Sequence, residues 1–171
     1  MQWMGLGLLL LLLAAFLLFW SRQRLQSAGL PLGRIVSTDT AGWRPLEKPF
    51  YDPETGLTGK PDYVVKVGGA LVPVEVKSGW APPEPYESHI FQLAAYCLLL
   101  ARTSGKRPPY GLIHYRNRTF AVDYTPALEE ALLAVVEEMH ADQRRTAVHR
   151  SHDEPARCTR CGFRSVCDQR L

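Results

Sequence analysis

Cysteine and histidine are scarce in this sequence, and neither occurs in its first half. The first histidine is His89 and the first cysteine is Cys97, in a chain of 171 residues. No disulfide can therefore staple the part of the chain that precedes Cys97, and a disulfide-stapled scaffold is excluded there. Three of the four cysteines lie together near the C-terminus, so cysteine is concentrated in one short segment.

The chain also lacks a strong excess of charge of either sign. Its 20 lysines and arginines stand against 17 aspartates and glutamates, which gives a formal net charge of +3. Charge alone thus does not identify a nucleic-acid-binding protein. The C-terminal segment is locally rich in arginine and could hold phosphates, with a solvated surface as the alternative. These arginines are Arg144, Arg145, Arg150, Arg157, Arg160, Arg164 and Arg170.

A long uncharged run stands near the N-terminus, at residues 3–20. It is just long enough to cross a bilayer, and Trp3 and Trp20 bracket it as interfacial aromatics do. A cleaved signal peptide is the alternative, but residues 1–2 carry no basic side chain and residues 19–21 make a poor cleavage site. Arginines follow the run, so we predict a single-pass membrane anchor at residues 1–21 with the next domain in the cytoplasm. They are Arg22, Arg24 and Arg34.

The rest of the chain is predicted to form one domain. A short linker at residues 22–30 leaves 31–171, about 140 residues, which is a common size for a single core. Residues 34–38, 62–67, 71–77, 110–115 and 119–124 are predicted to be strands, and 86–103 a helix. A second helix is predicted to begin at Pro126 after a Thr125 N-cap. This order predicts an α/β fold with a mixed central sheet flanked by helices. The apolar stripe of the second helix is Leu128, Leu132, Val135, Val136 and Met139.

Residues 59–77, GKPDYVVKVGGALVPVEVK, are predicted to form a β-hairpin with its turn at Gly68 and Gly69. Side chains alternate along a strand, so Glu75 and Lys77 lie on one face. Asp62 opens the partner strand and can approach both. Proline cannot donate to a β-ladder, so we expect a sheet edge or a bulge near residue 73.

These residue types suit chemistry on a phosphodiester. Two carboxylates, from Asp62 and Glu75, together with a backbone carbonyl are the oxygen ligands that Mg²⁺ prefers. A metal ion lowers the pKa of bound water and neutralises charge on a phosphate. Lys77 can orient that water or stabilise the developing charge. The alternative is an ordinary amphipathic hairpin, because the pattern ExK alone occurs by chance in most proteins.

The predicted helix at 86–103 carries the sequence QLAAY. Gln92 and Tyr96 are four residues apart and therefore share one face of the helix. The surrounding residues are apolar on nearly all sides, which predicts a helix buried against the sheet. A glutamine buried there needs hydrogen-bond partners. A core helix with one satisfied glutamine is the alternative to a functional site.

The C-terminal cysteines have the spacing C-x2-C-x5-C, at Cys158, Cys161 and Cys167. Three thiols so close together predict a metal site, because thiolates bind zinc and iron–sulfur clusters. His149 or His152 could complete a zinc site. The alternative for both histidines is a solvated polar connector.

Together, GxxD, ExK on the next strand and QxxxY on the following helix resemble the PD-(D/E)xK nuclease superfamily. The chain is most similar to its RecB-like branch and to the CRISPR-associated RecB-like exonucleases, the fourth numbered CRISPR-associated family. The resemblance implies a restriction-endonuclease-like fold and a DNA exonuclease that uses Mg²⁺ or Mn²⁺. It also implies metal ligation by Asp62, Glu75 and the Val76 carbonyl, catalysis by Lys77, and support from Gln92 and Tyr96.

The sequence departs from this family in two places. The resemblance implies a [4Fe–4S] cluster whose fourth cysteine lies near the start of the domain, where this chain has none. Cys97 could serve instead, although a small buried core residue is the simpler interpretation. Relatives often carry a metal-binding histidine before the aspartate. Here Glu47 lies in about that region, and an ordinary loop glutamate is its alternative.

The sequence thus predicts a membrane-anchored, metal-dependent nuclease that hydrolyses DNA, with a single-strand exonuclease in DNA repair, recombination or defence as the specific expectation. Two alternatives keep the same fold. One is a nucleic-acid-binding module without catalysis, and the other is a membrane scaffold that docks other proteins. Dependence of activity on a divalent metal and on Lys77 distinguishes the enzyme from both.

Overall fold

The computed structural model describes residues 34–36, 44–45 and 48–171. The predicted anchor at 1–21, the linker at 22–30 and Glu47 lie outside these residues. Within the described part of the chain, no helix has both the length and the apolar character needed to cross a membrane. The chain forms two compact units, Met1–Val135 and Val136–Leu171.

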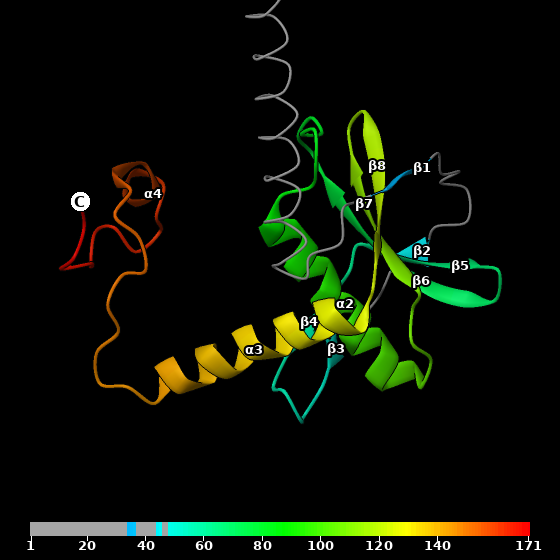
Figure 1. The fold of residues 1–171 in the computed structure, drawn as a ribbon, viewed down its shortest axis with the longest axis horizontal. Coiled ribbons are helices and arrows are strands. Elements are labelled where there is room, and N and C mark those ends of the chain that lie inside the picture. The colour runs from blue at the N-terminus through cyan, green and yellow to red at the C-terminus, as the bar shows by residue number, and fades with distance from the viewer. Residues whose placement is uncertain (1–33, 37–43, 46–47) are drawn as a thin grey trace, which may run out of the picture. The chain divides into compact units, whose positions relative to one another are not determined.

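The first unit is built on a six-stranded mixed sheet with the order β1-β8-β7-β6-β5-β2 (Figure 1). Only β6 and β7 pair in parallel, and the other neighbours are antiparallel. This confirms the predicted α/β fold with a mixed central sheet. The strands are β1 (Arg34–Val36), β2 (Arg44–Pro45), β5 (Tyr63–Val67), β6 (Ala70–Lys77), β7 (Tyr110–Tyr115) and β8 (Arg118–Asp123).

The β5–β6 hairpin forms where the sequence predicts it. Its turn residues Gly68 and Gly69 both have positive φ, 55° and 86°, which a residue with a side chain rarely adopts. Pro73 pairs with Val64 of β5, whereas the register with β7 begins one residue later, at Val74. At Pro73, β6 therefore has a pairing partner on one side only, which meets the expectation of a local sheet edge.

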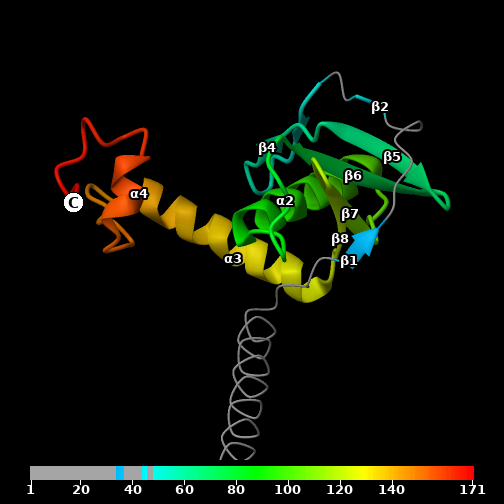
Figure 2. The same ribbon diagram turned by 90° about the horizontal axis from the view of Figure 1, so that it is seen from above.

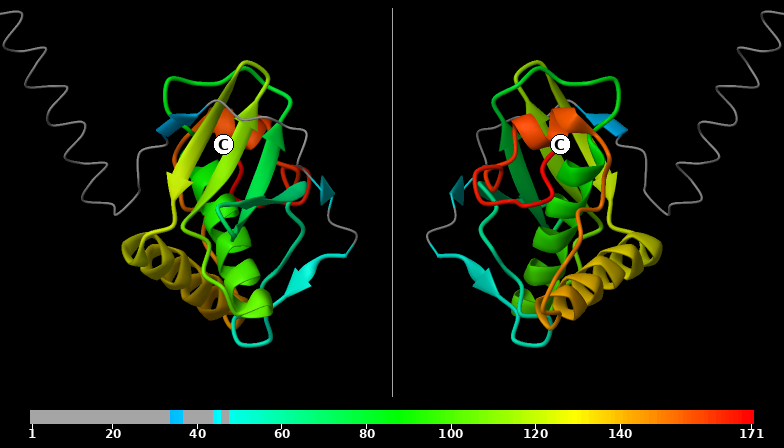
Figure 3. Two further views of the ribbon diagram at one scale, coloured as in Figure 1. Left: turned by 90° about the vertical axis from the view of Figure 1, so that its right-hand side faces the viewer. Right: turned by 90° about the vertical axis from the view of Figure 1, so that its left-hand side faces the viewer.

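Helix α2 (Glu87–Ser104) covers one face of this sheet, where it contacts β6 and β7 (Figure 3). Gly105 follows the helix and ends it in a left-handed conformation with φ of 68°. The helix and sheet approach closely at Gly111 of β7, where an added Cβ would lie 2.6 Å from Cγ of Leu93. A short hairpin not predicted from the sequence, β3 (Phe50–Tyr51) and β4 (Thr58–Gly59), also contacts α2.

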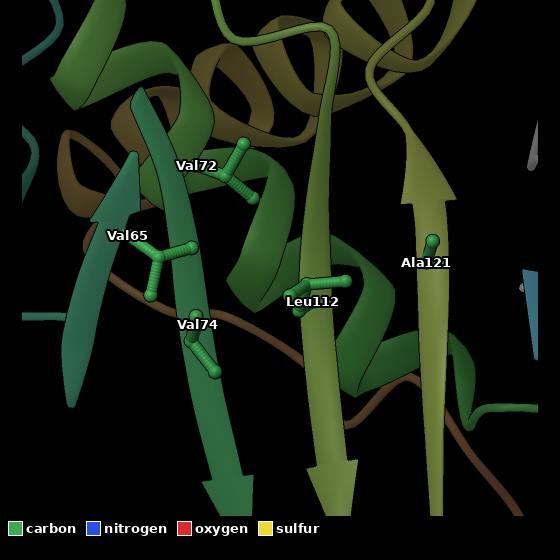
Figure 4. Close-up of a cluster of buried hydrophobic side chains, with 5 residues drawn as sticks. All are labelled: Val65, Val72, Val74, Leu112 and Ala121. Atoms are coloured by element: carbon green, nitrogen blue, oxygen red, sulfur yellow. The ribbon is translucent and has the colours of Figure 1, made fainter. Parts of the chain in front are cut away.

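The face opposite α2 carries a cluster of buried aliphatic side chains from all four central strands (Figure 4). Register explains the cluster, because residues directly opposite each other on paired strands share a face. Val65 lies opposite Val72, Val74 opposite Leu112, and Leu112 opposite Ala121. Each is at most 5% exposed, so β6 places apolar side chains on this face and leaves its other face for Glu75 and Lys77.

Helix α3 (Pro126–Gln143) follows β8 and is capped as predicted. The Leu128 N–H donates to Oγ1 of Thr125 at 3.1 Å. The predicted apolar stripe is only partly correct, because Leu128, Leu132 and Val136 are buried whereas Val135 is 38% exposed and Met139 is 54% exposed. Periodicity identifies the apolar face of a helix, but it does not tell which residues of that face a partner surface covers.

The second unit contains the short helix α4 (Pro155–Thr159) followed by turns (Figure 2). Hydrogen bonds from Arg150 to Gln169 join the segment before α4 to the segment after it. Three arginines of the arginine-rich C-terminal segment form ion pairs with neighbouring acids. The pairs are Arg145 with Asp142, Arg150 with Asp153 and Arg157 with Glu154.

Candidate active site

Four of the predicted site residues form one hydrogen-bonded network between β6 and α2. The Lys77 ammonium donates to Oε1 of Glu75 at 2.9 Å and to Oε1 of Gln92 at 2.7 Å. The Gln92 amide donates to the same Glu75 oxygen at 2.9 Å and to the Tyr96 hydroxyl at 2.9 Å. The glutamine, half-buried on the apolar helix, thus has its partners, and they are the residues that the sequence predicts beside it.

Local geometry explains how the network assembles. Glu75 and Lys77 are two residues apart on β6, so both side chains project toward α2. Gln92 and Tyr96 are one helical turn apart and face the sheet together. The Tyr96 ring packs over the backbone of Gly59, where an added Cβ would lie 2.9 Å from Cε1 of the ring. Gly59, the first residue of the GxxD pattern, therefore leaves space for the Tyr96 ring because it has no side chain.

Asp62 lies just before β5 and reaches the same segment of β6. Its Oδ2 accepts a hydrogen bond from the Val76 backbone N–H at 2.8 Å. The carboxylate is near enough to Glu75 for its charge to raise the pKa of that residue. The structure thus brings Asp62 beside the network, with Val76 contributing its backbone.

Electrostatics make the Glu75 carboxylate the unusual group of the site. Its side chain is largely buried, and burial raises its pKa above the usual glutamate range, although Lys77 and Gln92 act in the opposite direction. Burial likewise raises the pKa of the Tyr96 phenol. A buried carboxylate close to a second carboxylate is costly, and a divalent cation between them would relieve that cost. This oxygen donor set fits Mg²⁺ or Mn²⁺.

A family model described as the PD-(D/E)XK nuclease superfamily matches residues 7–168. The chain belongs to this superfamily. Membership implies a metal-dependent nuclease that acts on nucleic acid, and such nucleases typically use Mg²⁺ or Mn²⁺. Among solved structures, the chain is similar to the crystal structure of SSO0001, with 15% sequence identity and a TM-score of 0.43. That match covers 93% of this chain and 70% of the other.

The C-terminal cysteines of this superfamily member are free thiols that differ in exposure. Cys158 is buried, Cys161 exposed and Cys167 half-buried. All three line a cavity of about 270 Å³, together with His149 and His152. Among the described residues, no group of three or more His, Cys, Asp or Glu side chains is placed to hold a metal ion.

Cys97, considered as a fourth cluster ligand, is a core residue of α2 in the first unit. It is 1% exposed, and burial strongly raises the pKa of its thiol. A thiol that resists ionisation in this way is a poor candidate for metal binding. Its environment agrees with the alternative interpretation, a small buried hydrophobic residue.

Two residues near the network were missed from the sequence, His89 and Tyr115. His89 precedes Gln92 by three residues and so lies near it on α2. Tyr115 is directly opposite Lys77 in the β6–β7 register. The helical spacing from Gln92 could have revealed His89, but the partnership of Tyr115 with Lys77 depends on a parallel register that the sequence does not specify.

Proposed function

We propose that this protein is a nuclease of the RecB-like branch that hydrolyses DNA phosphodiesters, as a single-strand exonuclease similar to the CRISPR-associated ones. The observation that carries this proposal is the network in which Glu75, Lys77 and Gln92 share hydrogen bonds beside the Asp62 carboxylate. Partly buried polar groups that satisfy each other in this way are preorganised for charge stabilisation.

Each residue has a proposed role. Asp62, Glu75 and the Val76 carbonyl hold Mg²⁺ or Mn²⁺, which when bound supplies Lewis acidity and a water of lowered pKa. Lys77 directs its ammonium group toward negative charge that develops on the phosphate oxygens. Gln92 accepts from Lys77 and donates to Glu75, so it fixes the position of one relative to the other. Tyr96 accepts from the Gln92 amide and holds that amide in orientation.

The proposal of a single-stranded substrate is supported by the loop at residues 78–86. It follows Lys77 directly and carries Trp80 and Tyr86, which are 71% and 58% exposed. The loop is tied to the β7–β8 turn, because the Ala81 N–H donates to Oδ1 of Asn117 at 2.8 Å. Exposed aromatic rings on an anchored loop suit stacking with unpaired bases, which a duplex does not offer.

The cysteine motif is proposed to bind a metal ion or cluster that stabilises the C-terminal unit, with a [4Fe–4S] cluster and zinc as the two candidates. The Leu171 N–H donates to Sγ of Cys158 at 3.4 Å, which is the kind of contact that supports a thiolate ligand. Metal analysis and an absorbance spectrum of anaerobically purified protein separate the two candidates. Protein that contains neither iron nor zinc would contradict a metal role.

Residues 1–21 are proposed to anchor the protein in a membrane as a single-pass helix, with the nuclease domain on the cytoplasmic side. The support is the uncharged run with tryptophan at both ends and arginines after it. DNA repair, recombination and defence are the processes that such an enzyme could serve. Its position at a membrane suits the processing of DNA that enters the cell.

Digestion of end-labelled oligonucleotides tests the catalytic proposal. Full-length protein with Mg²⁺ is expected to shorten a single strand progressively from an end and to act more slowly on a blunt duplex. Glu75→Ala protein is the control and should leave both substrates intact. Equal activity in wild type and Glu75→Ala would favour a nucleic-acid-binding module or a membrane scaffold of the same fold.

A further inference from the structure

His89 is tied to the wall of the candidate active site by a buried tyrosine. Its Nδ1 lies 2.7 Å from the Tyr115 hydroxyl, and the Tyr115 ring is 1% exposed. The Tyr86 ring meets the imidazole edge-on, with 5.3 Å between the ring centroids. The imidazole is only half-buried, so two tyrosines hold it in one orientation while part of it remains accessible.

The position of His89 relates it to Lys77. Tyr115 lies opposite Lys77 in the parallel register of β6 and β7, so its hydroxyl brings His89 to the side of the site where Lys77 projects. Burial lowers the pKa of His89, and the positive charge of Lys77 lowers it further. The two side chains are therefore close enough to interact electrostatically. His89 is thus expected to be neutral at pH 7, with one ring nitrogen protonated and the other not.

Tyr115 determines which nitrogen carries the proton. Burial raises the pKa of its phenol, so the hydroxyl keeps its proton at neutral pH. A buried O–H group needs an acceptor, and Nδ1 of His89 lies 2.7 Å from this hydroxyl. The Tyr115 O–H is therefore the group that donates to Nδ1 of His89. The imidazole proton then resides on Nε2, which becomes a hydrogen-bond donor.

We propose that His89 is a further substrate-binding residue, which donates from Nε2–H to a non-bridging oxygen of the scissile phosphodiester beside Lys77. This inference rests on the proposed nuclease function. Lys77 attracts the phosphate as a point charge, and this attraction has no preferred direction. The neutral imidazole adds a hydrogen bond to the phosphate that does have a direction. Tyr115 is a positioning residue in this arrangement, because it acts on the substrate only through the imidazole.

Two amide substitutions separate this role from a structural one. His89→Gln places an amide N–H near the former Nε2, whereas His89→Asn retains only a group near the former Nδ1. Full-length variants are compared by the single-turnover cleavage rate of a fluorescent single-stranded oligonucleotide at saturating protein with Mg²⁺. We expect His89→Asn to lower the rate about tenfold or more, and His89→Gln to stay within about threefold of wild type. Thermal melting curves of the two variants should coincide.

The inference is overturned if His89→Asn cleaves at the wild-type rate, or if both amide variants lose the same activity. Tyr115→Phe gives an independent check that leaves the imidazole in place, and an unchanged rate there would refute the tautomer assignment. An inert wild type would refute the nuclease proposal instead. The affinity for the same oligonucleotide, measured by fluorescence anisotropy, would then test whether His89 contacts a phosphate. Only His89→Asn should bind it more weakly than wild type.

Discussion

Glu75 is the carboxylate of the site whose pKa is raised by burial. Because burial raises its pKa in the folded state, the folded protein holds this proton more tightly than the unfolded chain does. Without metal, its contribution to the free energy of unfolding therefore falls as pH rises from the unfolded pKa, about 4.3, through the raised folded pKa. Glu75→Gln removes this titration.

The prediction for Glu75 is a difference between two stability curves. Measured by urea unfolding in EDTA, the stability of wild type minus that of Glu75→Gln should decrease as pH rises through this window. Mg²⁺ should reverse the decrease, because it binds the ionised carboxylate. A difference that is independent of pH would show that the Glu75 carboxyl is not perturbed.

Lys77 offers a matched comparison with Lys66, an exposed lysine on the neighbouring strand β5. Lys77→Ala removes the ammonium group that bridges Glu75 and Gln92, and we expect the cleavage rate to fall about 100-fold. Lys66→Ala should cleave at the wild-type rate. Single-turnover kinetics measure both, and similar rates for the two variants would contradict a catalytic role for Lys77.

At the residue scale, much of the network follows from the sequence. Strand alternation places Glu75 beside Lys77, and helical spacing places Gln92 beside Tyr96. Asp62 was assigned from its position at the start of the hairpin, but its hydrogen bond to the Val76 N–H was not foreseen. That contact depends on the exact register of β5 and β6, and register is a tertiary property that turn residues specify only in part.

At the scale of elements, the contact between α2 and its neighbours depends on glycines that leave space for side chains. Gly111→Ala would press its Cβ against Leu93, and we expect a loss of about 1–3 kcal/mol in the free energy of unfolding. Gly59→Ala would displace the Tyr96 ring, so the cleavage rate should fall by more than the stability loss explains. Urea unfolding and single-turnover kinetics measure the two effects.

Gly79→Ala is the stability control for both glycine substitutions, because an added Cβ there meets no atom within 4 Å. It should leave the free energy of unfolding near that of wild type. If Gly59→Ala also cleaves at the wild-type rate, then the position of Tyr96 does not affect the reaction.

The elements that the sequence predicts are those with a long pattern. The β5–β6 hairpin and α2 lie within one residue of their predicted bounds, since alternation, paired glycines and a terminal glycine are local signals. Strands β2, β3 and β4 were missed, because two residues carry no periodicity. Strand β2 exists through its pairing with a distant segment, Arg44 with Val64 in β5, whereas β3 and β4 pair only with each other.

At the scale of the whole molecule, a membrane fractionation experiment tests the predicted anchor at residues 1–21. Full-length protein should stay with the membrane pellet after alkaline carbonate extraction, whereas a chain that lacks residues 1–30 should appear in the supernatant. The deletion is expected to retain nuclease activity, because the site residues lie in the domain that follows. Full-length protein released by carbonate would contradict the anchor.

The composition of the chain gave little direct information about its activity. A net charge of +3 does not distinguish a nuclease from other domains, and several C-terminal arginines are engaged in local ion pairs. The motifs carried the functional prediction because their spacing is tied to strands and a helix that pack together. The spacing of the cysteines does not choose between zinc and an iron–sulfur cluster, since a fourth ligand is not specified by the three thiols.

The central claim is that the carboxylates of Asp62 and Glu75 hold one divalent cation. Isothermal titration of Mn²⁺ into the full-length protein, Asp62→Asn and Glu75→Gln tests it most directly, because it requires neither a substrate nor turnover. We predict one site in the wild type and at least a tenfold weaker affinity, about 1.4 kcal/mol, in each variant. Wild-type affinity in both variants would contradict the claim, whatever the nuclease assays show.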